Sequence, residues 1–516
     1  MSRRAVIATA LLVACYAIWS AEKIELYLRG DDLGRHLKNG ELILSSTTPP
    51  GTVAKLLHTN FYSYATPDFE FVNHHWLAGV VYFLVWKAAG FTGLNTFYVL
   101  LGSLAFLLSF RMAERAAGWP MATALALPMM PILRLHPSVR PEVFTLLFCS
   151  VFLWLLWNHK SWRSLLWLPA IEIAWVNLHI GFIFGPVFVG AFLLAELLRR
   201  GPALPRGVSP WQTEFYKKKA ALLTRWLGIL ALTVLATLLN PSGVYGAIYP
   251  FTIWSNYGID VIENHSVPYL ESHGFQHEYL LLKLILMVLY LSFFVTLRRA
   301  AKFPIALFIL AILLGAMAWF AIRNQTILAM FALAAIGINA GLSGIRWRTP
   351  VLAFLIAAGL CYNGAKLWAM RDTIGLGMYP GVSAAADFLR ASNLRGPVLN
   401  NFNIGGYLTH YLYPQYRVYV DSRPEAYPAV FLDEKYQQPL NNEDQWAALL
   451  AEYQFNVLVF SAASTWENAF FARRSRDPDW AAVFAQTPIA ILVRRTPANQ
   501  SFIREHEISR ESLFRK

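Results

Sequence analysis

The sequence has 516 residues, of which 56% are hydrophobic and only 15% are charged, and it includes 18 Trp, 23 Tyr and 35 Phe. A soluble protein averages roughly 25% charged residues, so this composition excludes a soluble multidomain protein, a disordered chain, a collagen and a coiled coil. It predicts an integral membrane protein. The cysteines Cys15, Cys149 and Cys361 lie far apart in apolar runs and indicate neither a disulfide framework nor a cysteine metal site.

The chain opens with Arg3-Arg4 and an apolar run that ends near residue 20. No small-x-small cleavage site follows, so we expect an uncleaved first helix at 4–20 with its amino end in the cytoplasm. Ten further apolar stretches are long enough, or almost long enough, to span a membrane. They are 93–110, 119–133, 141–157, 163–178, 181–198, 221–239, 278–297, 303–320, 325–341 and 349–369. We therefore expect about eleven transmembrane helices within 1–378.

The apolar stretch 76–90 contains Lys87 and is short, so we expect it to lie in the outer membrane interface. With eleven spans, every inner loop is basic, and basic loops are retained in the cytoplasm. Those loops are 111–115, 159–163, 199–219, 298–302 and 346–348. Counting 76–90 as a span would place most of them outside. The bias also accounts for much of the net charge of +13 without a nucleic acid partner.

This topology leaves two long outer loops, 21–92 and 240–277, and an extracytoplasmic tail at 379–516. The tail alternates helix-like and strand-like segments, which predicts a soluble α/β domain. We expect helices at 383–391 and 443–453, and strands at 397–400, 417–421, 457–460 and 489–494.

Uncommon polar residues collect at the outer face of this topology. Ionisable groups near the apolar slab are costly and usually face a cavity or one another, so their convergence predicts a single outward-facing site. They are Asp31, Asp32, Arg35, His36, His58, Asn73, His74, His75, Arg134, His136, Arg140, Asn177, His179, Asn240, Asp260, Glu263, His265, Arg323 and Asn324.

Asp31 and Asp32 follow Gly30 just beyond the first helix. One interpretation is a turn and a helix cap, because Gly-Asp favours both. The other is a carboxylate that accepts a proton from an attacking hydroxyl. His36 follows Asp32 by four residues and would share its helix face, so this pair could share a proton or hold a metal.

Asn73-His74-His75-Trp76 opens the interfacial segment, where Trp76 has the features of a membrane-interface anchor. The two histidines could be metal ligands, although adjacent helical residues point about 100° apart. This angle disfavours metal binding by both.

Arg134, His136, Arg140 and Arg323 could be cations at helix ends that reach lipid headgroups. If they face one pocket, they instead suit an anionic ligand, since arginine binds phosphate through two hydrogen bonds. Both interpretations stay open at this point.

An ordered set of motifs resembles a group of uncharacterised bacterial multi-spanning membrane proteins related to the GT-C-fold glycosyltransferases. The motifs are Asp32-x-x-x-His36-Leu37-x-x-Gly40, Phe61-x-Ser63-Tyr64, Phe71-Val72-Asn73-His74-x-Trp76-Leu77, Arg140-Pro141-Glu142-Val143-Phe144, Asn177-Leu178-His179-Ile180-Gly181, Asn240-Pro241-Ser242-Gly243, Phe402-Asn403-x-Gly405-Gly406-Tyr407-Leu408 and Val420-Asp421-x-Arg423. Together they cover nearly the whole chain in the expected order.

The resemblance implies an inverting transferase of the bacterial inner membrane that takes a sugar from a polyprenyl-phosphate carrier on the outer face. An acidic residue of the first outer loop would be the base, here Asp32 or Asp31, and arginines would neutralise the phosphate. Three departures from the group occur: Gly34-Arg35 replaces an aromatic pair, Asn60 replaces an acid, and His75 replaces another acid. Fewer acids weaken the case for a carboxylate-bound divalent metal, so the metal requirement stays open.

Asn403, Asp421 and Arg423 follow tail strands, where ligands often bind in α/β domains. Asn403 is equally a turn former, and Asp421 with Arg423 is equally a structural ion pair. We favour these structural interpretations for each residue. Binding of an acceptor or partner by the tail as a whole is a hypothesis.

Three functions compete. The first is transfer of a lipid-linked sugar to a glycan, lipid or protein acceptor of the cell envelope. The second is transport of lipid-linked sugars, which the absence of a detectable inverted repeat disfavours. The third is a non-catalytic assembly protein whose tail recruits an envelope partner. We take the first as the prediction. The sequence does not indicate the oligomeric state.

Overall fold

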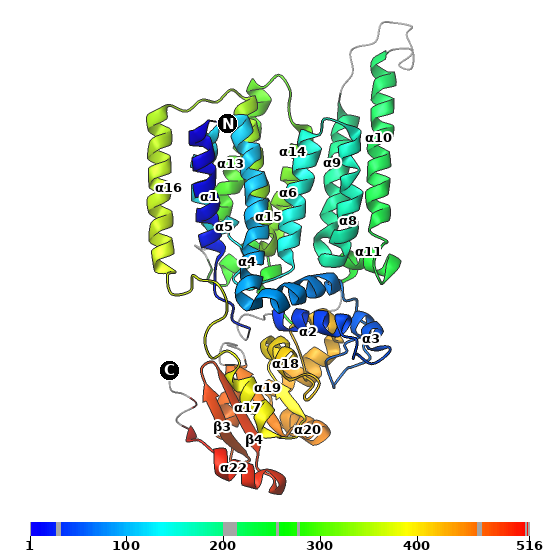
Figure 1. The fold of residues 1–516 in the computed structure, drawn as a ribbon, viewed down its shortest axis with the longest axis vertical. Coiled ribbons are helices and arrows are strands. Elements are labelled where there is room, and N and C mark those ends of the chain that lie inside the picture. Colours follow the sequence, from blue (N-terminus) through cyan, green and yellow to red (C-terminus); the bar gives the residue numbers. More distant parts are fainter. Residues whose placement is uncertain are drawn as a thin grey trace.

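The protein is described by a computed structural model that covers residues 2–26, 32–199, 214–253, 257–275, 279–461, 467–510 and 513. It is mostly helical, at 69% of residues, with a small carboxyl-terminal sheet. Figure 1 shows two parts arranged end to end, a bundle of long helices and a smaller α/β unit, with short helices of the first loop between them.

The bundle consists of long apolar helices that run alternately in opposite directions (Figure 1). Each apolar stretch predicted as a span coincides with one described helix or with two consecutive ones. The helices are α1 (Arg3–Ser20), α4 (Trp76–Ala117), α5 (Trp119–Leu133), α6 (Glu142–Asn158), α7 (Trp162–Leu165), α8 (Trp167–Leu178), α9 (Phe184–Leu198), α10 (Glu214–Ala236), α13 (Leu280–Arg299), α14 (Ile305–Phe320), α15 (Gln325–Leu342) and α16 (Thr349–Ala369).

Seven of the described helices are long and apolar enough to cross a membrane. Three more, α5, α6 and α14, are apolar but shorter. The lengths of the seven longer helices match the thickness of a bilayer's hydrocarbon core. A multi-pass helical membrane protein is therefore confirmed, whereas the count of eleven spans and the sidedness of the chain stay predictions.

Helix α4 bends sharply at Gly90, whose φ of 63° and ψ of −166° are not helical. Glycine adopts such angles without a steric penalty because it lacks a Cβ. The part of α4 before Gly90 runs across the end of the bundle, and the part after it runs along the bundle (Figure 1). Because of this bend, the segment 76–90 is oriented differently from the predicted spans. The contact of this segment with lipid stays a prediction.

Helix α2 (Leu33–Leu44) of the first loop packs closely against the first part of α4, and α3 (Thr52–His58) follows it. Glycines make this crossing close. A Cβ added at Gly40 would lie 2.3 Å from the carbonyl oxygen of Gly79. The same crossing brings the residues at the start of α2 next to those at the start of α4.

The second long loop and the remaining connections contribute short elements at the same end of the bundle or within the tail. They are η1 (Ile180–Ile183), α11 (Gly243–Thr252), η4 (Ile262–Asn264), α12 (Val267–Ser272), η5 (Ile322–Asn324), η6 (Phe402–Ile404), η7 (Pro424–Ala426), the π-helix η8 (Phe431–Gln437) and η9 (Pro497–Asn499).

The tail contains a four-stranded sheet in the order β1-β2-β4-β3, in which β1 and β2 are parallel and the other two pairs are antiparallel. The strands are β1 (Val398–Asn400), β2 (Val457–Ser461), β3 (Trp480–Gln486) and β4 (Ile489–Arg494). The tail helices are α17 (Ala384–Ser392), α18 (Gly405–Leu412), α19 (Gln438–Asn441), α20 (Glu443–Tyr453), α21 (Asn468–Arg474) and α22 (Gln500–His506).

The strands predicted at 397–400, 457–460 and 489–494 and the helices predicted at 383–391 and 443–453 are confirmed within a residue or two. The strand predicted at 417–421 is wrong. Val418 makes only a single parallel bridge, and its partner is Ser63 of the first loop. Val418 and Val420 are apolar because they are buried in the cores, not because they lie in the sheet. Strand β3 was not predicted.

The first loop and the tail are joined through a common hydrophobic core. One cluster of buried side chains includes Leu37 and Tyr62 of the first loop together with Tyr407 and Val457 of the tail. Ser63 donates a hydrogen bond of 2.9 Å from its hydroxyl to the carbonyl oxygen of Tyr419. The tail therefore packs directly against the loop that carries the predicted base.

We expect Gly40→Ala to lower the melting temperature of the purified protein in detergent, because the added methyl group must displace the backbone of α4. Overpacking of this kind costs about 1–3 kcal/mol. Gly364→Ala on α16 is the matched control, since a Cβ there meets no atom within 4 Å. Equal melting temperatures for the two variants would show that the close crossing does not constrain the fold.

Candidate functional site

Polar side chains from the first loop, the helix ends and the tail gather where the bundle meets the α/β unit. We call this group the interface cluster. Its charged and imidazole groups lie close enough to affect one another's ionisation. The cluster comprises Asp32, Arg35, His36, His74, His75, Glu142, His179, Arg323, Arg423 and Glu425. Seven of these ten residues belong to the outer polar set predicted from the sequence. Arg423 was predicted separately, as a residue of the tail.

Asp32 stands at the start of α2, but its side chain makes no capping hydrogen bond to that helix. Instead, the hydroxyl of Ser422 donates to its Oδ1 at 2.7 Å, and Nη2 of Arg35 lies 3.2 Å from the same oxygen. The side chain is 30% exposed. Among the described residues, no hydrogen bond or ion pair involves its other oxygen. Asp31, the alternative base, lies outside the described residues.

Four histidines of the cluster pack together. The ring of His75 stacks on that of His179 with centroids 5.1 Å apart and meets that of His36 edge-on at 5.4 Å. The His74 ring lies 3.9 Å from that of His75. Nδ1 of His179 is 2.7 Å from the hydroxyl of Thr145. In the described part of the chain, both ring nitrogens of His36 and Nε2 of His75 are buried without a hydrogen-bond partner.

Burial keeps these imidazoles uncharged. Removal from water disfavours the protonated ring and lowers the pKa of His74 to about 3 and that of His179 to about 4, and the pKa of His36 falls well below its usual range as well. Neighbouring arginines lower these pKa values further. The positive charge of the site at neutral pH therefore comes from its arginines.

Arg140 and His136 are brought together by Glu263. Nη1 of Arg140 lies 3.0 Å from a carboxylate oxygen of Glu263, and Nε2 of His136 lies 3.6 Å from the same oxygen. Arg323 lies at the other side, where it donates to Oε1 of Glu142 and to Oδ1 of Asn264, each at 3.1 Å. Three of the four predicted phosphate ligands thus lie around one group of acids.

Two of the predicted residues are held elsewhere. Arg134 forms an ion pair of 3.2 Å with Glu22, which follows the first helix. His265 is bound to Asp260 and stacks on Tyr269 with ring centroids 4.0 Å apart. Neither side chain makes a described contact with Asp32 or the four histidines.

Asn73 and Asn177 fix backbone at the edge of the cluster. Nδ2 of Asn73 donates to the carbonyl oxygen of Leu56 at 3.2 Å. Asn177 accepts a hydrogen bond of 2.9 Å from the indole of Trp76 and donates to the carbonyl oxygen of Leu239. Trp76 therefore binds to the end of α8, a contact that an interface anchor alone does not require.

The tail contributes Asp421 and Arg423, which form a buried ion pair with Nε to Oδ1 at 2.8 Å. Arg423 also donates to Oδ1 of Asn60 at 2.8 Å and lies 4.9 Å from the centre of the Phe71 ring. This is the structural ion pair favoured from the sequence, and it joins the tail to the first loop. Asn403 lies in η6, half-buried.

Sequence reasoning missed Glu142, Ser422 and Glu425 as site residues, and it gave Arg35, one of the outer polar residues, no role of its own. Glu142 and Glu425 each lie two residues after an arginine that was singled out, Arg140 and Arg423. Acidic residues are scarce, with 31 in the whole chain, so an acid beside a motif arginine was the available signal. Ser422 carried no signal, since serine is common in turns.

No group of three or more His, Cys, Asp or Glu side chains within the described residues is arranged to hold a metal ion. The histidines stack on one another instead of pointing at a common centre. The described donor set therefore does not fit the divalent metal left open by the sequence, and no step below uses one.

Comparison with known proteins gives matches among solved structures only, since no family model and no curated protein matches the chain. An Archaeoglobus fulgidus oligosaccharyltransferase in complex with Zn and sulfate is similar at 12% identity and a TM-score of 0.53, over 94% of this chain and 73% of that one. The oligosaccharyltransferase AglB of the same organism, with an inhibitory peptide and a dolichol-phosphate, gives 11% identity and a TM-score of 0.54, over 96% and 75%.

A mycobacterial arabinofuranosyltransferase, AftD, is similar at 15% identity and a TM-score of 0.51, over 96% of this chain and 40% of AftD. These proteins are GT-C-fold glycosyltransferases. The chain has the GT-C fold. The similarity predicted from the motifs is thereby confirmed, and at these identities it establishes the fold alone.

We expect Glu425→Gln to change the pH dependence of stability. Burial, with the charge of Asp32 adding to it, raises the pKa of Glu425 from 4.5 to about 7. The folded protein therefore binds this proton more tightly than the unfolded chain, and the resulting stability is complete below pH 4.5 and is lost as the pH rises through 7. The variant should melt at a higher temperature than wild type at pH 8 and at a similar temperature at pH 4.5.

The matched control is Glu505→Gln on α22, where the side chain is exposed. Its melting temperature should track that of wild type at both pH values. A Glu425→Gln variant that is less stable than wild type at pH 8 would mean that this carboxylate is ionised and bound in the folded protein.

Proposed function

We propose that the protein is a membrane glycosyltransferase that moves a sugar from a polyprenyl-phosphate carrier to an acceptor of the cell envelope. The observation that carries the proposal is the position of Asp32. A partly exposed carboxylate lies at the meeting point of the first loop, the helix ends and the tail of a GT-C fold.

Asp32 is proposed as the general base. Ser422 and Arg35 both contact its Oδ1, which fixes the carboxylate and leaves the other oxygen as the proton acceptor. An acceptor hydroxyl would lose its proton to that oxygen while its own oxygen bonds to the anomeric carbon of the sugar. The bond between that carbon and the phosphate oxygen would break, and the polyprenyl phosphate would leave with the electron pair. Attack opposite the leaving group inverts the carbon.

Arginines are proposed to stabilise the leaving phosphate. Arg35 is 2% exposed, and its Nε and Nη1 have no hydrogen-bond partner among the described residues. A buried guanidinium with unused donors is costly unless an anion binds it. Arg323 and Arg140 are paired with Glu142 and Glu263, and they would add positive charge beside the phosphate. His136 would add charge only when protonated.

The related fold supports a lipid-linked donor, because AglB was solved with a dolichol-phosphate. We propose the same class of donor here, used at the outer face of the bacterial inner membrane. The amino terminus would be cytoplasmic, and residues 379–516 would be an extracytoplasmic unit. A lipid-linked substrate would reach the interface cluster from the bilayer, beside the helix ends that carry Glu142 and Arg323.

Asp32→Asn should abolish release of free polyprenyl phosphate from a panel of polyprenyl-phosphate sugars presented to the protein in lipid nanodiscs. Loss of a general base costs about 10²–10⁴-fold in rate. Each donor is assayed with an envelope extract as acceptor source, with and without a divalent metal chelator. The donor that is consumed identifies the sugar.

Asp387→Asn is the matched control, because Asp387 pairs with Arg390 on the tail surface. It should release polyprenyl phosphate at the wild-type rate. Release that persists in Asp32→Asn would remove Asp32 as the base. Absence of release by wild type from every donor would favour a transporter or an assembly protein instead.

The sidedness can be tested by thiol labelling in a bacterial host. In a variant whose three native cysteines are replaced by serine, Arg395→Cys on the tail should react with a membrane-impermeant maleimide in intact spheroplasts. Lys160→Cys, between α6 and α7, should react only after lysis, since positively charged loops stay in the cytoplasm. The reverse labelling pattern would place the interface cluster in the cytoplasm.

A further inference from the structure

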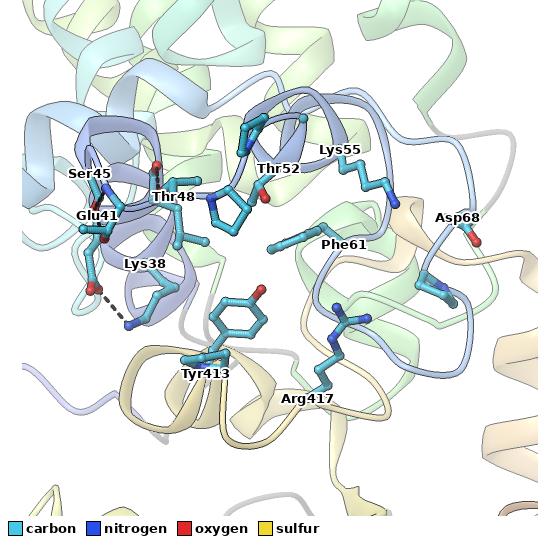
Figure 2. Close-up of a pocket in the computed structure, with 17 residues that line it drawn as sticks. Lys38, Glu41, Ser45, Thr48, Thr52, Lys55, Phe61, Asp68, Tyr413 and Arg417 are labelled. Atoms are coloured by element: carbon cyan, nitrogen blue, oxygen red, sulfur yellow. Dashed lines mark hydrogen bonds and ion pairs between the residues drawn. The ribbon is translucent and has the colours of Figure 1, made fainter.

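A cavity lies between the first loop and the tail, away from the interface cluster (Figure 2). Its volume is about 710 Å³, which is within the range of small-molecule sites. The walls come from the second half of α2, the segment that leads into α3, and the turn after α18. The cavity therefore exists only because the tail packs against the first loop.

The wall combines flat aromatic surface with hydroxyl groups. The rings of Phe61 and Tyr413 lie 5.5 Å apart and both point toward the hollow (Figure 2). Phe61 is buried, and Tyr413 is half-buried. Around them, four hydroxyl side chains line the rim: Ser45, Thr47, Thr48 and Thr52. A sugar ring has one face of C–H groups and an edge of hydroxyls, so it can pack on such rings while it hydrogen-bonds to the rim.

The charges of the wall favour an anion. Lys38 is already neutralised by Glu41, with Nζ 2.7 Å from the carboxylate. Lys55 and Arg417 also line the cavity, and neither is paired with a carboxylate within the described part of the chain. Arg417 lies 5.8 Å from the centre of the Phe61 ring, so its guanidinium stands beside the aromatic surface. Asp68 offsets one of these two charges, which leaves the cavity with a net positive charge.

We propose that this cavity binds an acidic saccharide, with the carboxylate of the sugar on Arg417 and Lys55 and the ring against Phe61 and Tyr413. Arginine binds a carboxylate through two parallel hydrogen bonds, and lysine adds a point charge. A neutral sugar would leave the net positive charge of the cavity unbalanced, and a small inorganic anion would leave the aromatic rings without a partner. The combination is specific for a ligand that carries both features.

The cavity and the proposed base share one rigid element. Asp32 begins α2 and Glu41 lies nine residues later, so at 1.5 Å per residue the two are roughly 13 Å apart along the helix axis. A short oligosaccharide spans such a distance. The assignment of this ligand as the acceptor rests on the proposed function, and the binding itself does not.

Binding can be measured directly on the full chain in nanodiscs by saturation-transfer NMR. The probes are glucuronic acid, glucose and inorganic phosphate, each titrated separately and in competition. Glucuronic acid should bind at least tenfold more tightly than glucose. Equal binding of glucose would overturn the requirement for an anion. Phosphate that binds as tightly as glucuronic acid would overturn the requirement for a sugar, and no binding of glucuronic acid would overturn the proposal as a whole.

Arg417→Gln should weaken glucuronic acid binding about tenfold, equivalent to about 1.4 kcal/mol. Arg417 is exposed, so the substitution leaves the core unchanged. Arg395→Gln is the matched control, an exposed arginine of the same tail outside the cavity. Tyr413→Leu should weaken glucuronic acid and glucose alike. Equal affinity of wild type and Arg417→Gln would remove the binding from this cavity.

The same variants separate this proposal from the proposed function. Asp32→Asn should bind glucuronic acid as wild type does, because residue 32 does not line the cavity and the amide oxygen of asparagine can still accept the hydrogen bond from Ser422. If Asp32→Asn and wild type bind the sugar equally while neither consumes any donor, the cavity stands and the transferase proposal fails. If wild type consumes donor but binds no acidic saccharide, the transferase stands and the cavity proposal fails.

Discussion

The buried ion pair between Asp421 and Arg423 is the contact on which the arrangement of the site depends. Arg423 donates to Asp421 within the tail and to Asn60 in the first loop, and it covers the ring of Phe71. Breaking a buried pair by removal of one partner costs about 3–5 kcal/mol, since the remaining charge is left uncompensated. Ser422 lies between the two paired residues, so the geometry that fixes the pair also fixes the hydroxyl that binds Asp32. The tail is thus part of the active-site architecture proposed here.

Burial divides the interface cluster into neutral and charged groups. The histidines are numerous, but their pKa values are lowered by removal from water, so they supply shape and hydrogen-bonding groups without positive charge. The arginines keep their charge, and each forms an ion pair with an acid of the site. Arg35 touches Asp32 and still has unused donors. A donor phosphate would therefore meet its strongest attraction next to the proposed base, which is where a leaving group must be stabilised.

The helices of the bundle could be predicted from the sequence because apolar runs of spanning length have few alternatives. The bend at Gly90 was not itself predicted, only a boundary between the interfacial stretch 76–90 and the span 93–110, since a glycine permits a bend without requiring it. In the tail, Val418 and Val420 have the alternation of a strand, yet they are buried between the first loop and the tail cores. Burial explains their apolar character equally well, and the choice depends on a partner more than 350 residues away. Strand β3 was not predicted because its apolar sequence has neither a clear alternation nor clear boundaries.

The same limit applies to the site. Asp32 and His36 were found because their spacing is local, whereas Ser422 and Glu425 reach Asp32 only through the packing of the tail. Arg134 was grouped with the phosphate ligands by its position at a helix end, but it forms an ion pair with Glu22, which follows α1. The sequence predicts that such an arginine lies at one end of the bundle. Its ion pairs with acids from other segments then determine which site it faces, and these depend on the fold.

The cavity and the interface cluster both depend on the packing of the tail against the first loop. The tail turn 413–417 forms one wall of the cavity, and the tail turn 421–425 forms one wall of the interface cluster. Only a few residues separate these turns, and α2 forms the opposite wall of both. Any displacement of the tail from the first loop would open both sites together. An acceptor that binds the cavity would oppose that displacement and so favour the contact between Ser422 and Asp32. Acceptor binding and positioning of the base are then coupled through a single rigid contact, with no separate conformational switch.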